Sequence, residues 1–259
     1  MCVLAFAWQQ HVGYPLILVG NRDEFHRRPA APAGWWDDAP DILAGRDLQA
    51  GGTWMGFSRS GRFAVVTNFR EPPDLQPDSR SRGELVSDFL GSRRPPRSWQ
   101  DTVEADSYGA FNLIFGDPSE IRYMTNRGPA SGPLAAGVYG LSNHLLNTAW
   151  PKVTKTREGL RACIGEQTPD VECLFSLLLD DEIVPDDDLP DTGVPRAWER
   201  RLSPVFIRSP IYGTRSATVM MLSMDGQAFL EERTFDSDGR PAGSVSFTFG
   251  MDRSEDSPT

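Results

Sequence analysis

The amino-acid sequence predicts an α+β fold with mainly antiparallel sheets. Short apolar runs that are typical of strands occupy both ends of the chain, whereas the best helical spacing lies in the middle, at residues 150–164 and 171–180. Polar links join neighbouring apolar runs, as they do in hairpins. Helices that lie between two strand-rich halves favour the α+β class. We expect residues 1–250 to form one domain and residues 251–259 a polar tail.

Four apolar runs in the first third of the chain pair into two predicted hairpins. They are Cys2–Trp8, Pro15–Gly20, Thr53–Ser58 and Arg62–Asn68. The second pair turns at Ser60-Gly61 and shows period-two apolar residues. Between the hairpins, residues 29–52 are rich in Pro, Trp and Asp, and we expect an irregular structured loop. A short helix is predicted at Glu84–Leu90, and the RRPPR sequence of Arg93–Arg97 is expected to break the chain after it.

The second half of the chain contributes the main helices and further strands. Pro151 is well placed in the first turn of the helix that begins near Trp150. The acidic, proline-broken run Asp180–Asp191 is expected to be a solvated loop, and Asp225-Gly226 is a good hairpin turn. The expected strands are Ala110–Phe115, Ile121–Thr125, Val138–Asn143, Ala217–Ser223, Ala228–Phe235 and Val245–Phe249.

Composition excludes several classes of protein. The chain has 36 acidic and 26 basic residues and a net charge of −10, which argues against electrostatic binding of nucleic acid. No run approaches the roughly 18–20 apolar residues of a membrane helix, so no stable membrane insertion is expected. The opening MCVLAFAW lacks the basic start of a signal peptide. Cys2, Cys163 and Cys173 are odd in number and unclustered, so we expect a cytoplasmic protein with neither a disulfide framework nor a metal site.

Cys2 suggests chemistry because of its position. Removal of Met1 before so small a side chain makes Cys2 the N-terminal residue of the mature protein. Such a cysteine carries its own base, since an α-amine has a pKa of about 7.7–8.0 and a thiol one of about 8.5. The amine, directly or through a water, then takes the thiol proton. A small apolar residue that begins a buried strand is the commoner use of such a cysteine, and this alternative stays open.

Four polar residues, Asn21, Arg22, Asp23 and Glu24, directly follow the second apolar run. Unpaired buried charge is costly, so such a cluster at the end of a buried strand is unusual. Strand alternation places the first and third of these residues on one face and the second and fourth on the other. If the first two strands pair, the cluster lies beside Cys2, where a cation would lower the thiol pKa and a carboxylate would hold the α-amine. A structural ion network that caps the hairpin is the alternative.

Short motifs extend this pattern in order from residue 2 to about residue 249. They are Met1-Cys2, Asn21–Phe25 with Arg28-Pro29, Gly51–Trp54, Thr67-Asn68, Arg82–Leu85, Phe111–Leu113, Asn126–Gly128, Tyr139–Asn143 and Tyr212–Arg215. With these motifs the chain resembles the NRDE family, which includes Transport and Golgi organization protein 2. That family is similar to the cysteine branch of the N-terminal nucleophile hydrolases. The resemblance implies a four-layer αββα fold, with two mainly antiparallel sheets between helix layers.

The resemblance also implies roles for individual residues. The cysteine hydrolases use an N-terminal Cys, an Arg-x-x-Asp pair on the second strand, a mid-chain oxyanion Asn and a late Arg. Cys2 matches the nucleophile, Asn143 the oxyanion Asn, and Arg215 the late Arg.

The second strand departs from the pattern of the cysteine hydrolases. At the Arg-x-x-Asp spacing, Asn21 and Glu24 fill the Arg and Asp positions. Arg22 and Asp23 are displaced by one residue, which reverses the face to which a strand side chain points. Which pair supports the cysteine therefore stays open.

Each candidate also has a structural reading. The Asn143 amide suits a developing oxyanion, although a strand-end turn is the commoner fate of such a residue. Asn68 is a second candidate, because its backbone N–H is placed to complete the oxyanion hole. Arg215 suits a carboxylate or phosphate, or else closes a structural network around Glu24.

Two functions from different classes fit the sequence. The first is an amidohydrolase, thioesterase or acyltransferase in which Cys2 attacks the amide or thioester of a hydrophobic acyl group. The second is non-catalytic handling of haem, acyl-CoA or lipid, since family members have been linked to haem trafficking, lipid homeostasis and secretory-pathway organisation. We expect a small-molecule partner and no resident cofactor, with haem or CoA as potential ligands. The sequence does not indicate an oligomeric state.

Overall fold

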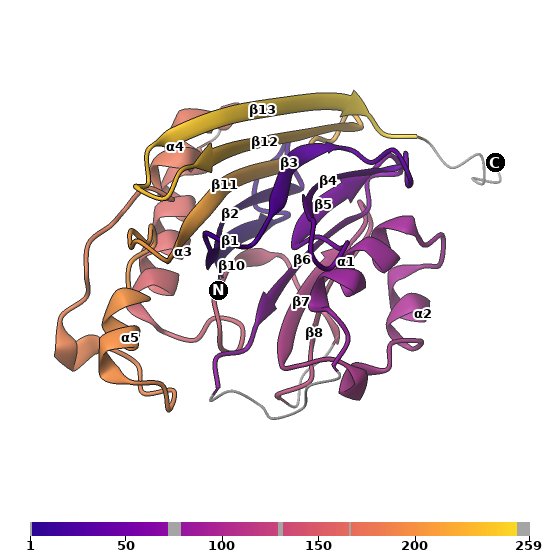
Figure 1. Cartoon of the computed structure of the whole chain (residues 1–259). Helices are drawn as coiled ribbons and strands as arrows, with labels where there is room; N and C mark the ends of the chain where they lie inside the picture. The colour runs from indigo at the N-terminus through magenta and orange to yellow at the C-terminus, as the bar shows by residue number, and fades with distance from the viewer. Residues whose placement is uncertain (1, 72–78, 129–131, 166, 253–259) are drawn as a thin grey trace, which may run out of the picture.

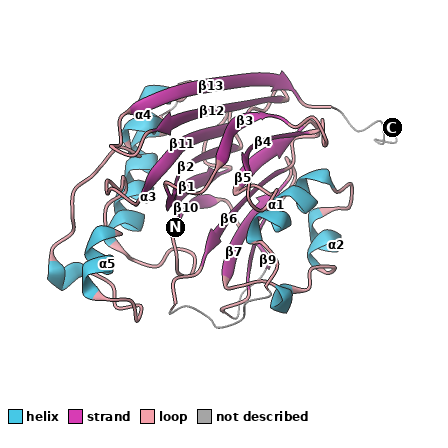
Figure 2. Cartoon of the chain, in the orientation of Figure 1, coloured by secondary structure: helices cyan, strands magenta, loops and turns pink. Residues whose placement is uncertain are grey.

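The computed structural model describes residues 2–71, 79–128, 132–165 and 167–252. Two antiparallel sheets lie face to face, and helices cover the outer face of each (Figures 1 and 2). This arrangement confirms the predicted four-layer αββα fold. Residues 253–259 of the predicted tail lie outside the described residues.

One sheet has six strands and the other has seven among the described residues. In order across the first sheet the strands are β10 (Gly137–Leu141), β1 (Cys2–Trp8), β2 (Leu16–Phe25), β11 (Tyr212–Leu222), β12 (Gln227–Phe235) and β13 (Pro241–Gly250). The second sheet runs β3 (Ala30–Trp35), β4 (Ile42–Asp47), β5 (Met55–Ser58), β6 (Phe63–Asn68), β7 (Phe111–Gly116), β8 (Ile121–Thr125) and β9 (Gly132–Pro133). The predicted hairpins β1–β2, β5–β6 and β11–β12 are all present.

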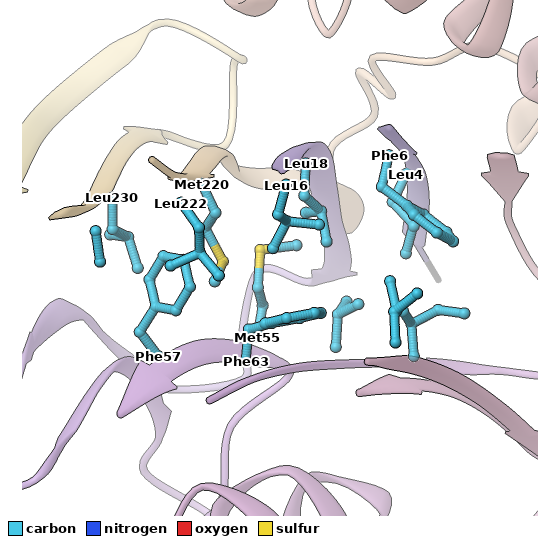
Figure 3. Close-up of a cluster of buried hydrophobic side chains, with 14 of the residues drawn as sticks. Leu4, Phe6, Leu16, Leu18, Met55, Phe57, Phe63, Met220, Leu222 and Leu230 are labelled. Carbon is cyan, nitrogen blue, oxygen red and sulfur yellow. The ribbon is translucent and has the colours of Figure 1, made fainter. Parts of the chain in front are cut away.

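The main hydrophobic core lies between the two sheets (Figure 3). Leu4, Phe6 and Trp8 of β1 point into it, whereas the alternating Val3 and Ala5 belong to a second cluster under the helices. Both faces of β1 are therefore buried, which explains why its sequence is apolar throughout. Side chains from the second sheet complete the core, among them Met55, Phe57 and Phe63.

Helices form the outer layers. On the six-stranded sheet, α3 (Pro151–Cys163) packs against β1 and β10, and α4 (Val171–Ser176) packs against β11 (Figure 1). On the seven-stranded sheet lie α1 (Arg82–Gly91) and α2 (Pro96–Gln100). The remaining helical segments are η1 (Ala105–Ser107), η2 (Asp186–Asp188) and α5 (Arg196–Arg201). In the part of the chain that the structure describes, no helix is long and apolar enough to cross a membrane.

The prediction of a loop over residues 29–52 is wrong, because this segment contains β3 and β4. The strand pattern is hidden for two physical reasons. β3 is an edge strand that contains Pro32, which an edge tolerates, and its pairing with β4 shifts register between Ala31 and Gly34. The end of β4 carries Arg46 and Asp47, which border a cavity, in place of an apolar residue.

Two helix predictions also need correction. The expected break at Arg93–Arg97 overlaps α2, whose first residue is Pro96, a position where proline starts a helix without losing a hydrogen bond. The helix expected at residues 171–180 ends at Ser176. The short helix α5 was not predicted, and it begins in the same way after Pro195.

The expectation of no disulfide is contradicted by a bond between Cys163 and Cys173. These residues lie at the end of α3 and inside α4, and their Cα atoms are 6.0 Å apart. That distance is within the range that a disulfide spans. Cys2 is a free, buried cysteine.

Candidate active site

A cavity of about 800 Å³ opens beside the start of β1. Its walls come from both sheets, through β2, β4, β6, β11 and β12, and from the segment that leads into α1. All but two of the sequence-predicted site residues border it. Those that do are Cys2, Arg22, Asp23, Glu24, Asn68 and Arg215.

Cys2 is the first residue of β1, and its thiol borders the cavity. Alternation with Leu4 and Phe6 directs the side chain toward the space between the sheets, and the residue is 7% exposed. Burial raises the pKa of the Cys2 thiol, and the Asp23 carboxylate acts in the same direction. The backbone N–H of Asp23, which donates to the sulfur, and the Arg22 guanidinium favour the thiolate. The site therefore holds a buried thiol between opposing charges.

The register of the first hairpin identifies the residue that faces Cys2. Cys2 pairs with Arg22 across β1 and β2, and directly opposed residues share one face of a sheet. Asn21 points to the other face, where its amide donates to the backbone oxygens of Leu178 (2.7 Å) and Val205 (2.9 Å). Asn21 thus anchors the helical layer, and Arg22 lies beside the thiol.

Asp23 borders the cavity and is almost fully buried. Its Oδ1 accepts a hydrogen bond from the Thr214 hydroxyl at 2.7 Å, and its backbone oxygen accepts one from the Tyr212 hydroxyl at 2.8 Å. Burial raises the pKa of the Asp23 carboxyl, while Lys152 and the Thr214 hydroxyl act in the opposite direction. These contacts join the end of β2 to β11 at the irregularity between Thr214 and Ser216.

Asn143 and Asn68 lie together beside the cysteine. The Asn143 amide nitrogen donates to the backbone oxygen and to Oδ1 of Asn68, both at 3.0 Å. The preceding Ser142 hydroxyl donates to the backbone oxygen of Cys2 at 2.8 Å. Asn68 borders the cavity and Asn143 is fully buried behind it. The structure therefore brings both predicted asparagines to the site, and Asn143 holds Asn68 in place.

Arg215 and Glu24 both border the cavity but do not pair in any hydrogen bond or ion pair of the described residues. The Arg215 Nη1 donates to the backbone oxygens of Phe25, His26 and Arg28, at 3.1, 3.2 and 3.1 Å. Oε1 of Glu24 accepts from the backbone N–H of Phe25 at 2.8 Å. Arg215 thereby fixes the turn that follows β2.

Comparisons with known proteins identify the family. A family model described as Transport and Golgi organisation 2 matches residues 1–237. The chain belongs to this family. It is 35% identical over 261 residues to the Transport and Golgi organization protein 2 homolog of Bos taurus, covering 90% of this chain and 93% of the relative. It is 29% identical to Transport and Golgi organization protein 2 of Drosophila melanogaster, covering 90% and 92%.

Among solved structures, this Transport and Golgi organisation 2 family member is similar to a Caenorhabditis elegans N-acylethanolamine-hydrolyzing acid amidase ortholog. The TM-score is 0.50 and the sequence identity 11%, over 85% of this chain and 92% of that chain. At this identity the similarity concerns the fold alone. It confirms the N-terminal nucleophile hydrolase-like fold.

A buried ionic cluster behind the site of this family member was not predicted from the sequence. It consists of Arg70, Glu199 and Lys152. Arg70 Nη1 lies 2.5 Å from Glu199 Oε2, and their side chains are 3% and 1% exposed. Glu199 also accepts from the backbone N–H of Thr192 at 3.1 Å. Lys152, 4% exposed, donates to the backbone oxygen of Leu202 at 2.8 Å. The available signal was Lys152 itself, a lysine next to Val153 in the first turn of an otherwise well-patterned helix.

Because Lys152 is buried, we expect the difference in stability between the unmodified chain and Lys152→Met to depend on pH. Burial lowers the pKa of Lys152 to about 8, and Arg70 acts in the same direction, whereas a lysine in an unfolded chain titrates near 10.4. Above pH 8 the unfolded chain binds more protons at this residue, so its contribution to the free energy of unfolding rises with pH. Relative to Lys152→Met, the free energy of unfolding should rise by about 2 kcal/mol between about pH 7.5 and 9.5.

Urea unfolding at each pH measures this difference. Lys155→Met is the matched control, because Lys155 lies on the same helix with its side chain 55% exposed. It should show no such rise relative to the unmodified chain. Parallel pH curves for the unmodified chain and Lys152→Met would contradict the prediction.

Proposed function

We propose that the chain is an N-terminal-cysteine hydrolase or acyltransferase that acts on the amide or thioester of a hydrophobic acyl group. The observation that carries the proposal is a free, buried Cys2 at the start of β1, on a cavity wall and directly across from Arg22. A thiol held beside a guanidinium is the environment of reactive cysteines. The similar solved structure is named for hydrolysis of N-acylethanolamines, which are amides of this kind.

The proposed reaction begins with removal of Met1, which frees the α-amine of Cys2. That amine takes the thiol proton, and the sulfur attacks the carbonyl carbon of the substrate. When the tetrahedral intermediate collapses, the amine returns the proton to the leaving nitrogen or sulfur, and a thioester to Cys2 remains. Water, or another acyl acceptor, then cleaves the thioester and restores the thiol.

The surroundings of Cys2 suit these steps. Burial and the Asp23 carboxylate raise the pKa of the Cys2 thiol, whereas the Arg22 guanidinium favours the thiolate. The same carboxylate favours the α-ammonium that forms when the amine takes the thiol proton. Asn68 offers an amide to the developing oxyanion, held by Asn143. The apolar part of the cavity wall suits an acyl chain. It includes Trp54, Val66, Phe69 and Phe235.

Turnover of matched amide and thioester probes tests this function. The protein, with Met1 removal checked by mass, is incubated with decanoyl p-nitroanilide and with the decanoyl thioester of N-acetylcysteamine. We expect hydrolysis of at least one probe above the buffer rate. Binding of the acyl probes without turnover would overturn the hydrolase and favour a carrier of acyl compounds or haem.

The paired asparagines yield a separate prediction. If the Asn68 amide stabilises the oxyanion, Asn68→Ala should lower kcat/KM by about 10²–10³-fold. Asn143→Ala should act in the same direction, because it removes both hydrogen bonds that orient Asn68. The control is Gln167→Ala, since Gln167 carries the same amide group, is exposed and does not border the cavity. Equal rates for Asn68→Ala and this control would contradict the assignment.

A further inference from the structure

The Arg22 guanidinium has one nitrogen without a partner. Its Nη1 is buried and makes no hydrogen bond among the described residues. The side chain is 12% exposed and borders the cavity on the same face as Cys2. A buried donor left without an acceptor is destabilising, so a ligand that supplies an acceptor to this guanidinium removes that cost.

The nearest carboxylate is already used by other groups. Asp47 Oδ2 lies 3.9 Å from Arg22 Nη2, too far for a hydrogen bond, and accepts from Arg28 Nε at 2.6 Å. Its Oδ1 accepts from the backbone N–H groups of Gln49 and Ala50, at 2.9 and 3.1 Å. Burial acts to raise the pKa of Asp47, but these hydrogen bonds outweigh it and hold the pKa below its ordinary value. Asp47 therefore positions Arg28 and leaves Arg22 incompletely neutralised.

Positive charge is crowded along this part of the wall. Burial lowers the pKa of Arg215, and neighbouring Arg22 acts in the same direction. Burial lowers the pKa of Arg82, where the Cys2 thiol opposes the shift and Arg28 adds to it. Of the six arginines that line the cavity, Arg46 and Arg80 pair with Asp38 and Glu84. The other four are Arg22, Arg28, Arg82 and Arg215.

The other carboxylates of this wall are held by other protein groups. Glu71 pairs with Arg127, and Asp23 Oδ1 accepts from the Thr214 hydroxyl. Glu24 accepts from the N–H of Phe25, and the buried Glu232 accepts from the N–H of Ala33 at 2.8 Å. Burial raises the pKa of Glu232, which favours its neutral form. No carboxylate of the described residues hydrogen-bonds the Arg22 guanidinium, so this cation beside Cys2 lacks a direct acid partner.

We propose that Arg22, with Arg28, Arg82 and Arg215, forms an anion subsite beside Cys2, so that the preferred substrate carries a carboxylate or phosphate within a few bonds of the reacting carbonyl. The subsite deepens the proposed hydrolase function and rests on it, because the bound anion is a substrate only if the protein hydrolyses it. Binding of the anion, in contrast, does not require turnover. Directly opposed strand residues have Cβ atoms about 4.5–5.5 Å apart. A carbonyl placed at the Cys2 sulfur thus brings a nearby anion within reach of Arg22.

The test measures binding in a protein that cannot turn over, the full-length Cys2→Ala variant, by calorimetry. Two ligand pairs differ in charge, the first at nearly constant shape and the second by the addition of a phosphate group. N-Decanoyl-β-alanine is compared with its primary amide, and N-decanoyl-phosphoethanolamine with N-decanoylethanolamine. We expect at least one anionic ligand to bind tenfold or more tightly than its neutral partner, with the pair that responds identifying carboxylate or phosphate. Equal affinity within both pairs, measured in Cys2→Ala alone, would overturn the proposal.

Added substitutions assign the effect to Arg22. Arg22→Gln should reduce the charge preference to about twofold or less. Arg27→Gln is the matched control, because Arg27 is exposed, lies over the Phe25 ring and is not part of the cavity wall, and it should retain the preference. Arg22→Lys, which keeps the positive charge, should retain part of it. A full charge preference in Arg22→Gln would overturn the assignment, and anion binding in a protein that hydrolyses nothing would support the subsite while removing the hydrolase.

Discussion

Replacing Cys2 by alanine should lower kcat/KM for acyl hydrolysis by about 10⁴-fold or more, the scale on which removal of a catalytic nucleophile acts. The loss follows from chemistry, since no other free cysteine lies in the part of the chain that the structure describes. Folding should survive, because alanine removes only a sulfur atom at the end of β1 and leaves the strand pairing intact. Steady-state rates and circular dichroism of the same preparation measure both quantities.

The matched control removes the other two cysteines. Cys163 and Cys173 bond to each other between α3 and α4 and do not border the cavity. The double variant Cys163→Ala/Cys173→Ala should therefore keep its hydrolytic rate while Cys2→Ala loses it. Hydrolysis that persists in Cys2→Ala would contradict the nucleophile.

The largest expected effect on stability comes from the Arg70–Glu199 pair. Glu199→Ala removes the carboxylate from a guanidinium that is almost fully buried, and breaking such a pair costs about 3–5 kcal/mol. The double variant Arg70→Met/Glu199→Leu should recover most of this loss, because apolar side chains of similar size need no charge partner. Urea unfolding gives the free energies.

An exposed pair provides the comparison. Glu158 and Arg161 lie 2.8 Å apart on the surface of α3, with both side chains about half exposed. Surface pairs of this kind contribute little, so Glu158→Ala should leave stability nearly unchanged. Similar losses for Glu199→Ala and Glu158→Ala would show that the buried pair does not support the fold.

The fold followed from the sequence wherever burial produced a regular pattern. The strands β1, β5 and β6 were predicted almost to the residue. Each of them is apolar on one face or on both faces, which gives a regular pattern in the sequence. The pattern failed at β3 and β4, where Pro32, a register shift and the cavity-facing Arg46 and Asp47 replace the alternation. Charged residues that line the cavity at the end of β4 thus interrupt the alternation by which a strand is predicted.

The candidate site was predicted only where its residues are linked by short-range pairing or by family motifs. Cys2 and Arg22 could be brought together because one hairpin joins them. Arg70 and Glu199 are 129 residues apart, and Lys152 meets them only after α3 packs on the six-stranded sheet. No spacing in the sequence indicates such a contact, because these charged residues come together only in the folded chain.

Intact mass of the native protein after incubation with an acyl thioester and an N-acyl amide tests directly whether Cys2 is an N-terminal nucleophile. We expect a mass without Met1 that gains one acyl group, with the adduct on the N-terminal peptide and none in Cys2→Ala. A protein that retains Met1 and gains no acyl group would contradict it, because the proposed mechanism needs the free α-amine of Cys2.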